Sequence, residues 1–261
     1  MTIDVAASTL FCLDKPLEEA VPDILLDETK YIEITDEWLH ALNQPRVERL
    51  LELKSSYDLR YSVHAPFIDV NIAAHDPIIR EAILRRLENS IKFSSALGAE
   101  ALVFHPGAIS ALEHFTPGMA WKLNLSSVDR LIKFAREYNV PMMIENVPEP
   151  FPFLMKSVED FERFYEEVGL DIKMVLDIAH ANLRGESGIF LERLVNRIGH
   201  IHVSDNVGKF DEHLQLGKGS IDWKVTIEAI KSTGFSGWIV VESFKGVEES
   251  LRLLKRLLNE D

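Results

Sequence analysis

The chain has 261 residues, of which 46% are hydrophobic and 27% charged, a balance typical of globular proteins. This composition excludes a disordered chain and a collagen-like fibre, and the single cysteine, Cys12, excludes a disulfide scaffold. Lys and Arg number 28 and Asp and Glu 42, so the formal net charge is −14. That charge disfavours nucleic acid and anionic membranes as partners, but a positive cleft or bound cations would offset it locally, so nucleic acid stays an alternative.

The N-terminal residues show no basic region followed by an apolar stretch, which a signal peptide requires. No apolar run approaches the ~20 residues that span a bilayer. We therefore expect a soluble, cytoplasmic protein without a membrane partner. The composition leaves the oligomeric state open, a homo-oligomer included.

Short apolar, β-branched segments alternate along the chain with longer segments of helical spacing. Near-continuous apolar runs of this kind are typical of strands that are buried on both faces of a parallel sheet. The expected strands are 3–8, 31–35, 60–64, 101–105, 142–146, 173–177, 200–204 and 238–243.

The segments between these strands repeat apolar residues at a spacing of three to four, which predicts helices. The clearest is 77–97, where Asp76 is a typical N-cap and Gly98 a typical stop. Further helices are expected over 121–138, 158–168 and 247–258. Eight strand–helix units of roughly 30 residues predict an α/β fold, a closed (β/α)₈ TIM barrel that forms a single domain over residues 1–261.

Six successive predicted strands carry a His, Asp or Glu at or near their C-terminal ends, where parallel barrels carry their chemistry. Buried carboxylates are costly unless they are paired or bind metal. A set of imidazoles and carboxylates without cysteine suits Zn²⁺, Mn²⁺, Fe²⁺, Co²⁺ or Mg²⁺. The sequence therefore predicts a metal or acid–base site at this end of the barrel. The six residues are His64, His105, Glu145, Asp177, His202 and Glu242.

Two further pairs add to this site. Asp177 and His180 are three residues apart, which brings their side chains to one side of a first helical turn. Asp211 and His213 lie in the long loop 205–219, which we interpret as a ligand-bearing loop rather than a connector.

Several other residues that often serve in functional sites are expected to have structural roles here. Cys12 has no evident base beside it, so we expect it to pack. The glycines of 216–220 match no phosphate-binding spacing, so we expect turns. Phe151 and Phe153 follow Glu145 and either wall a substrate pocket or cover the barrel rim. Three histidines in helical or loop stretches are expected at the surface; they are His40, His75 and His114.

From residue 60 to the C-terminus the chain resembles the xylose isomerase-like TIM-barrel superfamily, which includes sugar phosphate isomerases and epimerases and the apurinic endonuclease IV family. Each motif is weak singly, but their order and spacing are specific for the superfamily, though not for one reaction. The motifs are V-H-A-P-F-x-D-V-N at 63–71, L-V-F-H-P-G at 102–107, I-E-N at 144–146, V-L-D-I-A-H-A at 175–181, H-I-H-V-S-D-N at 200–206, D-E-H-L-Q-L-G-K-G-S-I-D-W at 211–223 and V-V-E-S at 240–243.

In the isomerase and epimerase branch, the resemblance implies one divalent metal, Mn²⁺, Zn²⁺, Co²⁺ or Mg²⁺, held by Glu145, Asp177, His202 and Glu242. It implies that Glu145 and Glu242 are catalytic: one removes a proton beside the carbonyl of a small sugar or sugar phosphate, and the other returns it after an enediolate has formed. It further implies substrate contacts from a second set, namely His64, His105, His180 and Lys209.

The endonuclease IV branch uses nine ligands for three metals, and a permitted residue type stands at all nine matching positions. This pattern supports an alternative function, a metal-dependent phosphodiesterase that acts on abasic DNA. The chain departs from that branch at Glu212, which stands where the branch has Arg, while 216–223 looks more like the sugar isomerases. Lys and Arg in the loops after the strands are also few, so we rank the isomerase or epimerase first. The nine positions are His64, His105, Glu145, Asp177, His180, His202, Asp211, His213 and Glu242.

A third interpretation is a barrel that binds a sugar or a metal as a sensor or carrier, without catalysis. It requires an incomplete acid–base pair, whereas this sequence carries two carboxylates that suit the task.

Overall fold

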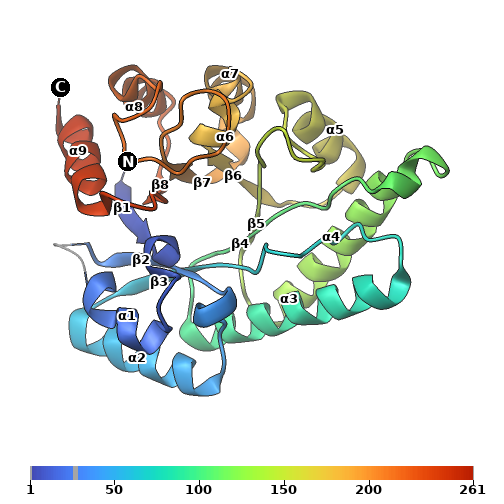
Figure 1. The fold of residues 1–261 in the computed structure, drawn as a ribbon, viewed down its shortest axis with the longest axis horizontal. Coiled ribbons are helices and arrows are strands. Elements are labelled where there is room, and N and C mark those ends of the chain that lie inside the picture. The colour runs from blue at the N-terminus through green and yellow to red at the C-terminus, as the bar shows by residue number, and fades with distance from the viewer. Residues whose placement is uncertain (1, 26–28, 261) are drawn as a thin grey trace.

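Eight parallel strands close into a barrel in the computed structural model, which describes residues 2–25 and 29–260 (Figure 1). Each strand pairs with the next along the chain, and β8 returns to pair with β1. The predicted (β/α)₈ barrel is therefore confirmed. The strands are β1 Ile3–Ser8, β2 Tyr31–Thr35, β3 Arg60–His64, β4 Leu102–Phe104, β5 Met142–Glu145, β6 Lys173–Asp177, β7 Ile198–Val203 and β8 Gly237–Val241.

Helices follow the strands and form the outer layer around the barrel (Figure 1). The α-helices are α1 Leu17–Ile24, α2 Gln44–Tyr57, α3 Pro77–Leu97, α4 Met119–Glu137, α5 Val158–Val168, α6 Ile178–Asn182, α7 Ser187–Leu194, α8 Trp223–Ser232 and α9 Val247–Asn259. Short 3₁₀ turns lie at η1 Thr9–Cys12, η2 Trp38–His40, η3 Ala111–His114 and η4 Val195–Arg197.

The sequence-based boundaries differ from the observed ones mainly where strands end. The predicted strands 101–105, 142–146 and 238–243 each finish one or two residues too late. There the chain leaves the sheet toward the barrel mouth, so that His105 and Glu242 follow their strands directly rather than ending them. Four predicted strands and two predicted helices, α3 and α5, match the structure residue for residue.

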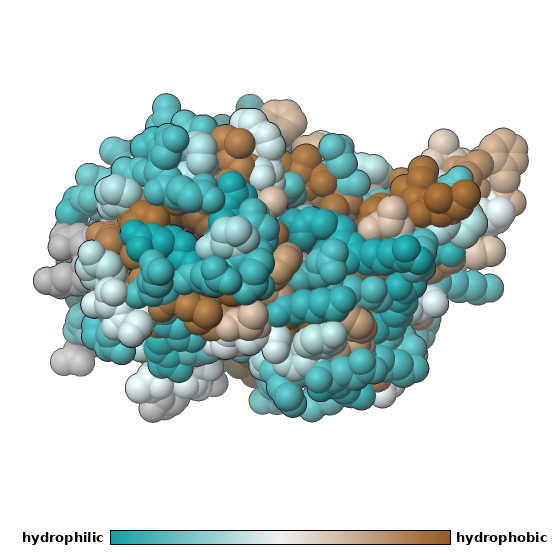
Figure 2. Space-filling model, turned by 90° about the horizontal axis from the view of Figure 1, so that it is seen from below, coloured by the Kyte–Doolittle hydropathy of each residue, from teal (hydrophilic) through white to brown (hydrophobic). Residues whose placement is uncertain are grey.

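The ends of α3 illustrate how local sequence sets an element. The carboxylate of Asp76 accepts hydrogen bonds from the amides of Ile78 and Ile79, at 2.8 and 3.1 Å, and so caps the N-terminus. Gly98 ends the helix with φ of 57°, in the left-handed region that glycine adopts without strain. The face of the molecule toward α2 and α3 is largely hydrophilic, because these helices turn their apolar sides to the barrel (Figure 2).

Two residues near the first strand test sequence-based expectations. Cys12 is 2% exposed and its burial raises the pKa of the thiol to about 12, so it is a packed, protonated side chain. The expectation that His40 lies at the surface is wrong, because it is fully buried. His114 is exposed, and His75 is half-buried.

No helix within residues 2–25 and 29–260 combines the length and the apolar composition needed to cross a membrane.

Candidate functional site at the barrel mouth

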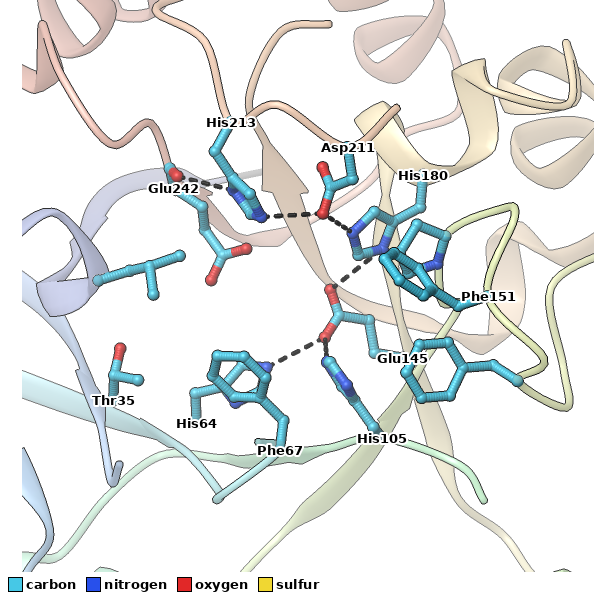
Figure 3. Close-up of a pocket in the computed structure, with 13 residues that line it drawn as sticks. Thr35, His64, Phe67, His105, Glu145, Phe151, His180, Asp211, His213 and Glu242 are labelled. Carbon is cyan, nitrogen blue, oxygen red and sulfur yellow. Dashed lines mark hydrogen bonds and ion pairs between the residues drawn. The ribbon is translucent and has the colours of Figure 1, made fainter. Parts of the chain in front are cut away.

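All nine predicted histidines and carboxylates meet at the C-terminal mouth of the barrel. Figure 3 shows those that line its cavity, which are all of them except Asp177 and His202. They form three groups, and within each group the potential ligand atoms lie within 4.8 Å of one another. The parallel sheet explains the meeting, because it brings the C-terminal ends of all strands to one rim. The groups are His64, His105 and Glu145; Glu145, Asp177, His202 and Glu242; and His180, Asp211 and His213.

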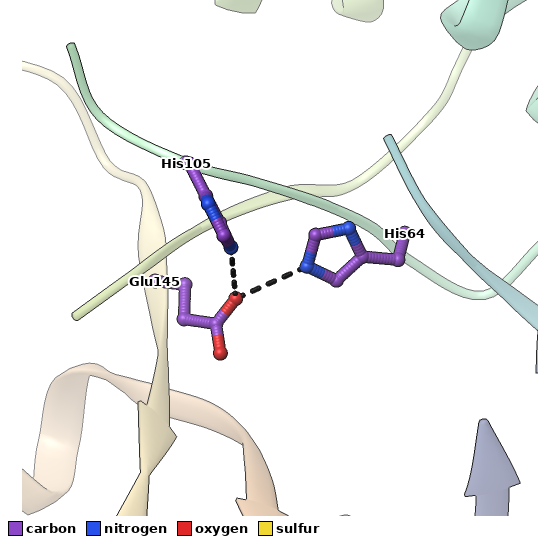
Figure 4. Close-up of side chains that lie close together, drawn as sticks. All are labelled: His64, His105 and Glu145. Carbon is purple, nitrogen blue, oxygen red and sulfur yellow. Dashed lines mark hydrogen bonds and ion pairs between the residues drawn. The ribbon is translucent and has the colours of Figure 1, made fainter. Parts of the chain in front are cut away.

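Glu145 joins the first two groups. Its Oε2 lies 3.2 Å from Nε2 of His64 and 3.0 Å from Nε2 of His105 (Figure 4). Its Oε1 lies 3.0 Å from Nδ1 of His202. Burial by itself raises the pKa of Glu145, but the three imidazoles outweigh burial and hold the pKa well below its usual value. Glu145 is therefore an ionised carboxylate at the centre of the site.

The two side-chain pairs singled out in the sequence meet in the third group. Asp177 caps α6 by accepting a 2.7 Å hydrogen bond from the amide of His180, which sets His180 at the mouth. The loop after β7 brings Asp211 and His213 to the same place. Oδ2 of Asp211 lies 3.1 Å from Nε2 of His180 and 3.0 Å from Nε2 of His213. The three side chains form a row above Glu145 (Figure 3).

Backbone carbonyls orient three of the histidines. Nδ1 of His64 lies 2.8 Å from the carbonyl oxygen of Ala65, and Nδ1 of His180 lies 2.7 Å from that of Asn146. Nδ1 of His213 is 2.9 Å from the carbonyl oxygen of Glu242. In the metal-free chain each of these rings also turns Nε2 toward a carboxylate, and the carboxylates outweigh burial and raise the pKa of all three imidazoles, so Nε2 carries a proton there. A ring held through Nδ1 in this way would bind a metal through Nε2 once that proton has left.

The second group fits a divalent cation on grounds of charge. Three carboxylates, those of Glu145, Asp177 and Glu242, converge with one imidazole in a buried setting. Burial and the neighbouring carboxylates raise the pKa of Asp177 to about 7, although His180 acts in the opposite direction. Oδ2 of Asp177 is also buried without a hydrogen-bond partner. A cation at this point would compensate both the repulsion and the unpaired oxygen.

The three groups open into a cavity of about 250 Å³ whose remaining wall is mostly apolar. Phe151 and Phe153 both line it, so the open choice between pocket wall and rim is decided in favour of the wall. None of the described lining residues is Lys or Arg, and Lys209 is an exposed residue outside the lining. The apolar part of the wall consists of Leu10, Phe67, Pro148, Phe151 and Phe153.

Three of the six basic side chains in the loops after the strands form ion pairs away from the cavity, whereas no ion pair within the described residues involves Lys209, Lys218 or Lys245. Lys156 and Arg184 both pair with Glu149, at 2.7 and 2.8 Å. Lys15 pairs with Asp23 at 2.7 Å. The lysines without an ion pair, like the paired residues, do not line the cavity, so a phosphate group there would meet no basic side chain among the described lining residues.

Sequence reasoning missed Glu33, which lies fully buried in β2 with Oε1 3.2 Å from Nε2 of His202. The signal for it was an acidic residue within an apolar strand that is covered on both faces. Thr35 and Leu10 in the cavity wall carried no such signal, because their types are common in strand ends and loops.

Comparisons with known proteins agree with this architecture. A Methanocaldococcus jannaschii protein, MJ1311, is 29% identical over 257 residues, which cover 97% of this chain and 87% of that protein. A probable endonuclease 4 of Mycobacterium leprae is 25% identical over 182 residues, which cover 66% of this chain and 69% of that protein. The crystal structure of a D-tagatose 3-epimerase-like protein superposes with a TM-score of 0.92 at 28% identity, covering 98% of this chain and 97% of that one.

The family model described as xylose isomerase-like TIM barrel matches residues 28–257. That range holds seven of the eight barrel strands and all nine polar residues of the mouth. The resemblance inferred from the sequence motifs is thereby confirmed, and the chain belongs to the xylose isomerase-like TIM-barrel family.

Proposed function

We propose that this chain is a divalent-metal-dependent isomerase or epimerase of a small, uncharged sugar. The observation that carries the proposal is the approach of Glu145 and Glu242 to one nitrogen, Nδ1 of His202, at 3.0 and 3.4 Å. The two carboxylates come from β5 and from the end of β8, and both line the cavity. Two such groups suit a reaction that removes a proton from carbon and returns a proton to carbon.

The contacts of the two carboxylates differ, and this difference suggests their order of action. Both oxygens of Glu145 face imidazoles, whereas Glu242 makes its one recorded side-chain contact at the longer distance of 3.4 Å. We assign to Glu242 the removal of the proton beside the sugar's carbonyl, which leaves an enediolate. Glu242 releases to solvent the proton that it took. Glu145 passes a proton from a neighbouring imidazolium, such as His64 at 3.2 Å, whose pKa the surrounding carboxylates raise to about 9, to the opposite face of the same carbon or to its neighbour. The first outcome is epimerisation and the second is isomerisation.

The residues suited to hold the metal are Glu145, Asp177, His202 and Glu242. When bound, Mn²⁺, Zn²⁺, Co²⁺ or Mg²⁺ would polarise the oxygens of the sugar and stabilise negative charge that develops on them. His64, His105 and His180 line the cavity and are placed to contact sugar hydroxyls.

The cavity wall favours an uncharged sugar over a sugar phosphate. A phosphate group would face several carboxylates and no lysine or arginine among the described lining residues. A monosaccharide suits a wall that is partly polar and partly apolar. Its hydroxyl groups can contact the polar side chains while its C–H groups pack against the apolar ones. The D-tagatose 3-epimerase-like protein, which shares 28% identity, supports ketoses as the first substrates to test.

The deciding experiment follows proton exchange. Ketopentoses and ketohexoses are incubated with metal-loaded protein in D₂O, and NMR detects deuterium on carbon. Wild type should exchange, and Glu242→Gln, assayed at a metal concentration that saturates the variant, should lower the rate by about 10²–10⁴-fold, because it removes the base. Glu248→Gln, on α9 and away from the cavity, is the control and should match wild type. Undiminished exchange in Glu242→Gln would remove the assigned role.

A second candidate, a phosphodiesterase that acts on abasic DNA, is favoured by the way Glu145 links two ligand groups beside a third. Such linked groups suit two or three metals about 3.5–4 Å apart that act on one phosphate. The probable endonuclease 4 relative points the same way. The absence of Lys and Arg from the described lining of the cavity counts against it, since contacts to DNA phosphates supply much of the affinity for DNA.

Metal content and DNA cleavage separate the two candidates. Elemental analysis of purified protein, after dialysis against a small excess of Zn²⁺ or Mn²⁺, should give close to one ion per chain for the sugar enzyme. Close to three ions, together with cleavage of a duplex with an abasic site that EDTA abolishes, would reverse the ranking.

A further inference from the structure

His202 differs from its neighbours in the ring nitrogen that it turns toward the site. His64, His180 and His213 hold Nδ1 against a backbone carbonyl and direct Nε2 at a carboxylate. His202 directs Nδ1 at Glu145 and Glu242, and its Nε2 faces Glu33. The orientation of this ring therefore depends on a side chain and not on the main chain.

Glu33 is held so that it faces this ring. The parallel register of β2 and β3 sets Glu33 opposite Ser62, whose hydroxyl donates a 2.9 Å hydrogen bond to Oε2. The other oxygen, Oε1, lies 3.2 Å from Nε2 of His202. This approach is oblique, and neither Oε1 nor Nε2 has a well-aligned hydrogen-bond partner. Each atom therefore has the other within 3.2 Å and no better-aligned partner among the described residues.

The position of Glu33 excludes direct contact with substrate. It is fully buried and does not line the cavity. A buried carboxylate without a strong partner costs free energy, so a residue of this type at this point requires a reason. Carboxylates behind metal-binding histidines accept the second N–H of the ring, fix its tautomer and orientation, and raise its basicity.

We propose that Glu33 is a positioning residue, which holds the Nε2–H of His202 and keeps Nδ1 directed at the centre formed by Glu145, Asp177 and Glu242. The inference rests on the proposed function, because that function requires the second ligand group to bind a metal. It also makes a claim about the ring itself that can be measured without metal.

The first test is metal affinity. Zn²⁺ and Mn²⁺ dissociation constants of wild type and Glu33→Gln are measured by competition with a chelator, and the variant should bind about 10–100-fold more weakly. Asp36→Asn is the matched control, since Asp36 is also a buried carboxylate beside β2 but pairs with Arg86 at 2.6 Å. The control should lose stability without losing metal affinity. Equal affinity in wild type and Glu33→Gln overturns the proposal.

The second test reads the ring in the metal-free protein. ¹⁵N-edited NMR detects the Nε2–H proton of His202, assigned by its loss in His202→Asn. In Glu33→Gln this signal should move upfield or vanish, while the Nδ1–H signals of His64, His180 and His213 stay in place. An unchanged His202 signal overturns the proposal. If Glu33→Gln does not fold, Glu33→Asp, which withdraws the carboxylate by one methylene, is measured in the same two ways.

The two tests separate this inference from the proposed function. If wild type binds neither Zn²⁺ nor Mn²⁺, the metal-dependent function fails, and the NMR comparison still decides whether Glu33 holds His202.

Discussion

His40 is a histidine enclosed by protein on all sides, although its sequence position beside a loop suggested a surface residue. Its Nδ1 lies 3.4 Å from the hydroxyl oxygen of Thr9, and its Nε2 has no hydrogen-bond partner. Burial lowers the pKa of His40, because the charged ring is poorly solvated there. The ring is therefore neutral in the folded chain near pH 7.

The burial of His40 predicts that the stability of the folded chain falls as the pH is lowered. Below a pH of about 6.5, His40 becomes protonated in the unfolded chain but stays neutral in the folded chain, because its folded pKa is lower. Acid therefore favours unfolding. The loss in free energy of unfolding grows as the pH falls toward the folded pKa. Wild type should therefore lose stability relative to His40→Leu between pH 7.5 and pH 5. Urea unfolding of both proteins at several pH values measures the difference, with the exposed His114→Leu as control. A difference that is constant across this range would contradict the assignment.

At the scale of elements, the loop between β7 and α8 depends on Asp205. Its Oδ2 accepts hydrogen bonds from the amide of Gly217 at 2.8 Å and from the indole of Trp223 at 2.9 Å. A Cβ at Gly219 would overlap Oδ1 of Asp205, so this glycine serves close packing and not phosphate binding. The loop that carries Asp211 and His213 is thus tied to the barrel at its base.

Asp205→Asn should destabilise the fold by about 3 kcal/mol, since an amide group cannot accept at both positions and leaves buried donors unpaired. Equilibrium urea unfolding measures the loss. Asp222→Asn is the control: Asp222 caps α8 through a 3.1 Å hydrogen bond from Val225, and asparagine caps helices about as well, so its cost should be small. Equal losses in the two variants would argue against the special role of Asp205.

At the scale of the whole molecule, closure of the barrel concentrates negative charge at one end. The chain carries a net charge of −14, and the three ligand groups bring four carboxylates together with five imidazoles. The carboxylates are those of Glu145, Asp177, Asp211 and Glu242. This crowding costs free energy in the folded state unless a cation offsets it. The site is therefore expected to couple metal binding to the stability of the entire barrel.

Metal should raise the stability of the folded protein by mass action, by about 2.7 kcal/mol when free metal is 100 times its dissociation constant. In Asp177→Asn this gain should shrink, because a ligand is lost. The metal-free variant should be at least as stable as metal-free wild type at pH 8, because the substitution removes a carboxylate whose pKa its surroundings raise to about 7. Thermal unfolding with and without Mn²⁺ or Zn²⁺ measures both effects. An equal metal response in the two proteins would exclude Asp177 as a ligand.

The sequence by itself determined the barrel, because strands buried on both faces leave apolar runs, and the helices between them carry a clear spacing, caps and stops. It also determined which polar residues gather, since every parallel strand ends at the same rim. His64, Asp177 and His202 could thus be selected before any coordinate was known.

Only the tertiary structure decided how those residues face one another. The sharing of Glu145 by three imidazoles, the inverted ring of His202 and the burial of His40 depend on contacts between strands and turns far apart in the chain. That Lys209 does not line the cavity depends on the path of one long loop. Local patterns record periodicity and residue type, whereas ring orientation and cavity shape arise from packing among all eight strands.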